Sequence, residues 1–346
     1  ADVVAMLKEW TGMAERMTAG HEAVHDGAVG LNPYAPPSDT GEALGLAASQ
    51  LTLTIGFGPS FFVKDGRDRF GIARHKPDLL ADLPKFPNET LDPARCGGDI
   101  VVQACANDPQ VAVHAIRNLA RVGFGTVAVR YSQLGFGRTS STTREQSTPR
   151  NLFGFKDGTN NIKAEDTGTL NDQVWVAKGD GPDWMTGGTY LISRRIRMRI
   201  EAWDRTTLLE QERVIGRTKL EDIELDDAVK PSNSHVALNT LTDDDGNDLQ
   251  ILRANMPFGS LGDSTSGTYY IAYSADPDIT ERMLRNMFIG DPPGNTDRIL
   301  DFSTAVTGTL FFTPTADFLN DPPDLPGAAA SATEPTPAYA GSLSIG

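Results

Sequence analysis

The sequence predicts an α+β protein made of two ferredoxin-like modules, in which helices cover antiparallel sheets. In the second half, the predicted elements run in the order strand, helix, strand, strand, helix, strand, which is typical of a ferredoxin-like module. The first half repeats this order without its first strand, and 346 residues suit two domains of ordinary size. We therefore expect modules at 1–150 and 151–320, with the first strand of the first module absent from this sequence; two unrelated α+β domains are the alternative.

The first half begins with a predicted helix over 1–17, followed by a Gly- and Pro-rich loop at about 20–45. Apolar side chains recur at intervals of three and four along this helix, which predicts one buried face. These side chains are Val4, Leu7, Trp10, Met13 and Met17. Apolar and β-branched runs predict three strands, at 51–58, 99–106 and 126–135.

A second helix is expected over 108–123, between the last two of these strands. Asp108 is suited to cap its N-terminus, Pro109 fits its first turn, and Gly123 follows its last turn. Because these signals agree with one another, they define both ends of the helix.

The second half begins with a long predicted strand over 188–203 and a helix over 206–217. Thr207 and Glu210 have the spacing of a capping box at the start of that helix. The sequence then predicts three further strands and one helix. The strands are expected at 249–256, 267–275 and 308–315, and the helix at 278–288.

Composition narrows the classes of partner. A hydrophobic fraction of 39% and a charged fraction of 22% are typical of a soluble globular protein. The net charge of −15 disfavours nucleic acid and anionic membranes as partners, because a surface of this sign repels both. No apolar run is long enough to span a bilayer. A homo-oligomer is compatible with this composition.

The two cysteines, Cys96 and Cys105, are too few for a disulfide framework and form neither CxxC nor CxxCH. A cysteine zinc site and covalently attached haem are therefore disfavoured. Reduced thiols are favoured over a single disulfide, which weakly indicates a reducing cytoplasm. The sequence starts at Ala1 without a signal-peptide pattern, so we expect a processed or trimmed terminus.

Two motifs suggest metal binding but fit loops better. HEAVH (21–25) matches the HExxH zinc motif, which requires a helix, whereas the glycines around it favour a solvated loop over a zinc peptidase. LTDDDGNDLQ (241–250) lacks the Gly and the Glu that a calcium-binding EF-hand loop needs at its sixth and twelfth positions. A hairpin turn at Asp245-Gly246 is the preferred interpretation.

Three polar residues stand in apolar surroundings. Asp157 lies in NLFGFKDGTNN (151–161), where glycines allow a ligand to approach and loss of solvation suits an aspartate to carry protons. A tight turn in which this aspartate caps the next segment is the alternative. His235, in PSNSHVALNT, is either a satisfied core residue or a ligand. Arg253, in the apolar stretch ILRANMPFG, needs a partner or a function.

Together these motifs resemble the dye-decolourising peroxidase family. GFKDGT resembles that family's GxxDG signature, and His235 and Arg253 stand where the family places its proximal haem ligand and its distal arginine. The resemblance extends over about residues 1–320. It implies two ferredoxin-like modules in a dimeric α+β barrel-like fold with haem b between them, the second module being the haem-binding one.

Different parts of the chain resemble different branches of this family. Residues up to about 218, including IRMRIEAWDRT, are similar to the type A branch. From IGRTKLEDIELDD onward, including NMFIGDPPGNTDRILDF, the chain is similar to the type B branch. The sequence therefore resembles a mosaic of the two.

The resemblance implies one non-covalent haem b per chain, with His235 as the ligand of its iron. The second ring N–H of that histidine needs an acceptor, which fixes the tautomer and strengthens the ligand. Asp297, in GNTDR, matches the family position of this acceptor, and Asp301 is the fallback.

On the opposite face of the haem, the resemblance implies that Asp157 moves a proton on bound peroxide and that Arg253 stabilises its negative charge. Asn255 follows on the same strand face and would position peroxide or water. The resemblance also places Gly158 and Thr159 beside the cofactor.

The implied function is that of a haem peroxidase, in which hydrogen peroxide oxidises dyes, phenols or similar small organic reductants through a ferryl intermediate. A haem-binding or haem-handling protein with little turnover is the alternative. Reductants too large for the pocket would pass electrons through an aromatic residue near the surface. Trp203, Tyr131 and Tyr273 are the candidates, with a plain core role as the alternative for each.

The end of the chain differs in composition from the rest. Residues 321–340 are rich in Pro and Ala and predict a flexible linker. In the tail GSLSIG (341–346), Leu343 and Ile345 alternate with small residues, which suits an extended segment in a groove. The tail resembles the cargo peptide that packages some of these peroxidases in encapsulin shells. We therefore expect an encapsulin shell protein as partner and a cytoplasmic location inside that compartment, with a frayed terminus as the alternative.

Overall fold

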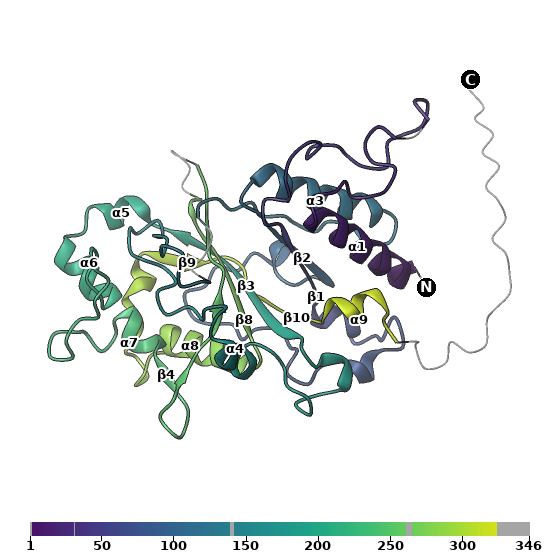
Figure 1. The fold of residues 1–346 in the computed structure, drawn as a ribbon. Coiled ribbons are helices and arrows are strands. Elements are labelled where there is room, and N and C mark those ends of the chain that lie inside the picture. Colours follow the sequence, from purple (N-terminus) through teal and green to yellow (C-terminus); the bar gives the residue numbers. More distant parts are fainter. Residues whose placement is uncertain (1, 31, 139–141, 261–264, 324–346) are drawn as a thin grey trace.

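The computed structural model describes residues 2–30, 32–138, 142–260 and 265–323 (Figure 1). In these ranges, helices cover an antiparallel sheet of eight strands, which confirms the α+β class. The strand order is β2-β1-β10-β3-β8-β6, with β7 also paired to β8 and β9 to β3. The strands are β1 (Thr52–Phe57), β2 (Ile100–Cys105), β3 (Thr189–Met198), β6 (Leu252–Arg253), β7 (Met256–Phe258), β8 (Gly267–Ser274), β9 (Ser303–Ala305) and β10 (Thr309–Thr313).

Helices gather at both ends of this sheet. Figure 1 shows α1, α3 and α9 together beside β1 and β2, whereas α5, α6 and α7 lie at the other end. Within the described ranges, no helix is long and apolar enough to cross a membrane. The helices are α1 (Asp2–Thr18), α2 (Pro59–Phe62), α3 (Pro109–Val122), α4 (Thr167–Gln173), α5 (Ile200–Asp204), α6 (Leu208–Ile215), α7 (His235–Asn239), α8 (Asp278–Phe288) and α9 (Ala316–Asn320).

The predicted apolar face of the N-terminal helix is confirmed. Leu7, Trp10, Met13 and Met17 are each at most 4% exposed and belong to the largest apolar core, whereas Val4 is only partly buried. The Trp10 indole N–H also donates to the carbonyl of Leu119 in α3, at 2.9 Å. Helices α1 and α3 therefore pack against each other as well as over the sheet.

Elements with clear local end signals were predicted well. The strands β1, β2, β8 and β10 and the helices α3 and α8 all lie where the sequence places them. The Asp108 side chain accepts a hydrogen bond from the Gln110 N–H, and Gly123 follows the last turn of α3. Thr207 caps α6 in the same way, but the Glu210 carboxylate binds Arg298 rather than closing a capping box.

The strand expected at 126–135 is absent from the described structure, so this prediction is wrong. Val127 makes one isolated bridge with Phe124, and the Phe136 N–H donates to the Pro257 carbonyl of β7 at 2.8 Å. Pro257 has no N–H to return to Phe136, so this segment cannot form a ladder of paired hydrogen bonds with the outer edge of β7.

Two other predicted strands have different limits. The strand expected over 188–203 ends at Met198, and the chain then turns into α5, which directs Trp203 into the core. The strand expected over 249–256 is divided into β5 (Asp248–Leu249), β6 and the start of β7. The hairpin expected at Asp245-Gly246 is confirmed, because β5 pairs with β4 (Leu241–Thr242).

A substitution at Asp108 tests whether the N-cap predicted from the sequence stabilises α3. Replacing Asp108 with Ala leaves the Gln110 N–H without its side-chain acceptor, so we expect the free energy of unfolding to fall by about 1 kcal/mol. Asp108→Asn is the control, since asparagine caps equally well and should change stability by only a few tenths of a kcal/mol. Urea unfolding measures both variants, and an equal loss in both would show that the cap does not stabilise α3.

Candidate functional site

Two buried phenylalanines anchor the loop 151–158 to the core. Phe153 and Phe155 are 2% and 1% exposed, and both rings pack against Trp203. The indole N–H of Trp203 donates to the carbonyl of Phe153 at 2.9 Å. Trp203 is fully buried, so the structure supports a core role for this candidate relay residue.

The backbone of this loop turns at two glycines. Gly154 and Gly158 have φ angles of 81° and 105°, which other residues rarely adopt. Between them, the Asp157 N–H donates to the Pro149 carbonyl at 2.9 Å. The carboxylate of Asp157 is therefore presented from a fixed backbone.

Asp157 faces two side chains from the sheet. The Arg253 Nη1 donates to Asp157 Oδ1 at 2.8 Å, and the Asn255 Nδ2 lies 3.3 Å from Oδ2 and 3.4 Å from Oδ1. The Asp157 and Arg253 side chains are 18% and 30% exposed, so this ion pair is partly shielded from solvent. The structure thus brings together the three residues expected on the distal side.

A residue that sequence reasoning missed holds Arg253 in position. The Asn161 side chain accepts a hydrogen bond from the Arg253 N–H at 2.8 Å and donates to the Arg253 carbonyl at 2.9 Å. These bonds pair both main-chain polar groups of Arg253, while the next residue, Ala254, donates its N–H to the Ile271 carbonyl of β8 at 2.9 Å. Asn161 is 4% exposed, and the pair of asparagines after GFKDGT is the only sequence signal for it.

The three side chains line one small cavity. Its volume is about 40 Å³, and Gly158 and Thr268 form part of its wall. A single water molecule needs about 10–15 Å³ by this measure, so the cavity has room for roughly three. A carboxylate, a guanidinium and an amide therefore converge on a space that suits a very small polar molecule.

The amide of Asn255 leaves one hydrogen-bonding atom unused. Its Oδ1 is buried and, among the described residues, has no hydrogen-bond partner. A buried polar atom without a partner costs free energy, and such atoms often mark the place of a missing water or ligand. Asn255 is therefore ready to accept a hydrogen bond from a molecule in the cavity.

His235 lies at the start of α7, where Ser234 caps the helix. Its Nδ1 is 2.7 Å from Asp297 Oδ2, and the Asp297 side chain is fully buried. The Asn239 amide donates to the His235 carbonyl at 2.7 Å and to Asp297 Oδ2 at 3.4 Å. Across the described part of the chain, no group bonds His235 Nε2, so this atom keeps its lone pair when Nδ1 donates to Asp297.

Two other predicted residues lie differently. Asp301, the fallback acceptor, is exposed, and its main-chain carbonyl accepts a hydrogen bond from Arg199 at 3.2 Å. Thr159 is exposed and donates its hydroxyl to Asp222. Gly158, in contrast, lines the cavity itself.

The two tyrosines considered as relays are partly buried. Burial raises the pKa of the Tyr273 hydroxyl, which donates to Gln103 of β2. Burial likewise raises the pKa of Tyr131. Neither tyrosine belongs to the wall of the 40 Å³ cavity.

The motifs that hinted at metals form loops, as expected. HEAVH is not helical, and the Glu22 carboxylate accepts the Ala28 N–H at 2.7 Å. In the hairpin, Asn247 side-chain and main-chain hydrogen bonds lower the pKa of Asp243. Within the described ranges, no group of three or more His, Cys, Asp or Glu residues is placed to hold a metal ion. Cys96 and Cys105 are free thiols.

Comparison with known protein families covers both halves of the chain. The family model described as "Dyp-type peroxidase, N-terminal" matches residues 1–137. The model described as "Dyp-type peroxidase, C-terminal" matches residues 148–318. Over 197 residues, this chain is 56% identical to a protein called dye-decolorizing peroxidase from Mycolicibacterium paratuberculosis. It is 55% identical, also over 197 residues, to a protein of the same name from Mycobacterium tuberculosis. These alignments cover 57% of this chain and 54% and 56% of the relatives, so the chain spans about half the length of the curated relatives it matches. A protein called deferrochelatase from Escherichia coli is 39% identical over 191 residues, 54% of this chain and 44% of that protein.

Solved structures give longer matches. A variant of Rhodococcus jostii RHA1 DypB in complex with heme is 40% identical, with a TM-score of 0.67 over 78% of this chain and 81% of that chain. The encapsulated DyP-type peroxidase from Mycobacterium smegmatis is 38% identical, with a TM-score of 0.72 over 94% of this chain and 91% of that one. Sequence and structure thus agree along most of the chain, which belongs to the Dyp-type peroxidase family.

Proposed function

We propose that this protein is a haem b peroxidase that uses hydrogen peroxide to oxidise dyes, phenols or similar small organic reductants. The observation that carries this proposal is the convergence of Asp157, Arg253 and Asn255 on one cavity of about 40 Å³. Hydrogen peroxide has two oxygen atoms and fits a space for roughly three waters. The relatives called dye-decolorizing peroxidase and the DypB variant in complex with heme support the same function.

The chain's own residues fit a haem. Within the described residues His235 Nε2 has no hydrogen-bond partner, and Asp297 accepts the hydrogen bond from Nδ1, which is the arrangement that orients a histidine ligand. Among the described residues the buried Asn255 Oδ1 has no partner, so it would accept a hydrogen bond from a small molecule in the distal cavity when haem is bound. His235 and Asp297 are therefore the proposed cofactor-binding residues, and Gly158 is a further one. Thr159 is a weaker candidate for binding the cofactor, because its side chain is exposed.

The distal residues divide the work on peroxide. When bound, the haem supplies the redox chemistry that withdraws electrons from the reductant. Asp157 accepts the proton from one peroxide oxygen and returns it to the other, so no net proton is lost. Arg253 stabilises the negative charge that develops between these transfers. Asn255 holds Asp157 through Nδ2 and accepts from the peroxide hydroxyl through Oδ1.

We also propose the two-module division near residue 150, which the separate family matches to 1–137 and 148–318 support. The described part of the chain ends at Pro323. Most of the linker 321–340 and the whole tail 341–346 therefore lie outside the described residues, and the interpretation of both segments rests on their sequence.

We further propose that the tail addresses the protein to an encapsulin shell in the cytoplasm, with the Pro- and Ala-rich segment as a tether. Leu343 and Ile345 alternate with small residues, which suits an extended segment in a groove. The similarity to the encapsulated DyP-type peroxidase from Mycobacterium smegmatis supports this address.

His235 is tested by the haem content of the purified protein. We expect His235→Ala to lose most bound haem or to shift its Soret band clearly, because the iron loses its protein ligand. Asp297→Asn keeps the shape but weakens the acceptor, so it should give a smaller change in the same direction. His25→Ala, at an exposed histidine, is the control. An unchanged spectrum and haem content in His235→Ala would rule out this ligand.

The distal residues are tested by stopped-flow spectroscopy with peroxide at equal haem occupancy. We expect Asp157→Asn or Arg253→Leu to slow the peroxide-dependent spectral change by about 10²- to 10⁴-fold, the usual range for a general acid–base group. One single variant is expected to be milder, because the two residues share the work unequally. Arg213→Leu, at an exposed arginine of α6, is the control. Wild-type rates in both single variants and in the double variant would contradict the proposal.

The tail is tested by co-expression with an encapsulin shell protein. We expect the full chain to co-purify with the shell, and a chain that ends at residue 320 to be left behind. A full-length variant with Leu343→Asp and Ile345→Asp separates the tail from the linker, and it should also be lost from the shell. Equal co-purification of all three forms would exclude the tail as the address.

A further inference from the structure

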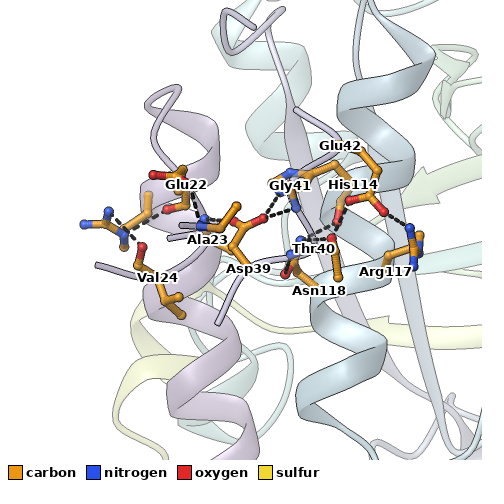
Figure 2. A network of polar contacts seen from close by, with 12 residues as sticks. Glu22, Ala23, Val24, Asp39, Thr40, Gly41, Glu42, His114, Arg117 and Asn118 are labelled. Atoms are coloured by element: carbon orange, nitrogen blue, oxygen red, sulfur yellow. Dashed lines mark hydrogen bonds and ion pairs between the residues drawn. The ribbon is translucent and has the colours of Figure 1, made fainter. Parts of the chain in front are cut away.

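A buried aspartate–histidine pair joins the loop 20–45 to helix α3, far along the sequence from Asp157, His235 and Arg253. The His114 Nε2 lies 2.8 Å from Asp39 Oδ1, and the two residues are 3% and 2% exposed. Figure 2 shows Asp39 between the backbone of Ala23 and Gly41, with His114 beside it. The N–H groups of Ala23 and Gly41 each donate to the carboxylate at 2.6 Å.

These contacts keep Asp39 ionised. Burial alone would raise the pKa of Asp39, but the hydrogen bonds from His114, Gly41 and Ala23 together hold it below its ordinary value. A carboxylate accepts hydrogen bonds only, so the Nε2 of His114 carries the proton between them. In the neutral imidazole, Nδ1 is then an acceptor.

The Nδ1 of His114 is free within the described structure, where no group forms a hydrogen bond with it. The histidine lines a cavity of about 200 Å³ between α1, the loop and α3. Met17, Ala43, Leu51 and Val111 provide apolar wall around it. His114 is therefore one of the polar residues in a wall whose apolar part includes these four side chains.

We propose that this cavity binds a single-ring phenol, whose hydroxyl donates to His114 Nδ1 while its ring packs against the apolar wall. The size agrees, because an engineered apolar cavity of about 150 Å³ in another protein binds benzene. Charge also agrees: among the described residues, Glu22 lines the cavity and no lysine or arginine does, so a neutral ligand is favoured over an anion.

The same arrangement gives a role to the unused HEAVH segment. Its Ala23 N–H fixes Asp39, and its His21 and Glu22 form part of the cavity wall. Arg16 of α1 donates to the carbonyls of Glu22 and Val24, which ties the segment to the helix. The site consists of elements from the first 120 residues, so phenol binding there does not depend on the proposed haem chemistry.

The test follows methyl resonances of the full-length protein labelled with ¹³C at its methionine methyl groups. We expect phenol to shift the Met17 resonance saturably, while that of Met198, in a separate core cluster, stays in place. Anisole has the same ring without a hydroxyl donor, so it leaves Nδ1 unpaired and should bind about tenfold more weakly. Benzoate should not bind measurably. Absence of a Met17 shift, or an affinity for anisole or benzoate equal to that for phenol, would overturn the proposal.

A cavity-filling variant localises the site. Ala43→Leu adds three carbon atoms to the wall and should weaken phenol binding at least tenfold, whereas Ala202→Leu on the exposed side of α5 is the matched control. If Ala43→Leu is poorly folded by thermal unfolding, Ala47→Leu at the exposed mouth replaces it. Wild-type affinity in a folded cavity-filling variant would place the phenol elsewhere and refute the assignment.

Discussion

The buried contact of the Trp203 indole with its aromatic neighbours is the interaction on which the site depends. On one side the indole stacks on Phe153 of the Asp157 loop, with ring centroids 4.3 Å apart. On the other it meets the edge of Phe302 at 5.0 Å, and Phe302 follows the short helical turn that Asp297 caps. One side chain thus supports both the distal carboxylate and the partner of the histidine. Truncating a buried tryptophan to alanine typically costs about 3–5 kcal/mol, enough to loosen both.

Elements with strong local signals could be predicted from the sequence, and those decided by distant contacts could not. Helix α3 has a cap, a first-turn proline and a final glycine, and all three act within the helix itself. The segment 126–135 has the composition of a strand, but a strand also needs a partner with free N–H groups, and Pro257 cannot supply one. Likewise, only the core around Phe153 decides that the chain turns into α5 after Met198.

In the candidate site, too, only the residues with a local sequence signal could be predicted. Asp157, Arg253 and His235 could be singled out because a charged or titratable group in an apolar stretch demands a partner, and the family resemblance added their roles. Asn161 could not, because an uncharged amide gives no such signal and its partner lies 92 residues away. The Asp39–His114 pair is separated by 75 residues and shares no motif, so only the folded chain reveals it.

The two hydrogen bonds between the Asn161 side chain and the main chain of Arg253 have an evolutionary consequence. Because the amide binds the N–H and the carbonyl, the path of the strand does not depend on which side chain occupies position 253. A substitution at position 253 alters the chemistry offered to the cavity and leaves its wall in place, whereas a substitution at position 161 leaves two partly buried main-chain groups without their partner. The fold therefore lets descendants of one ancestor diverge in reactivity while they inherit the same geometry.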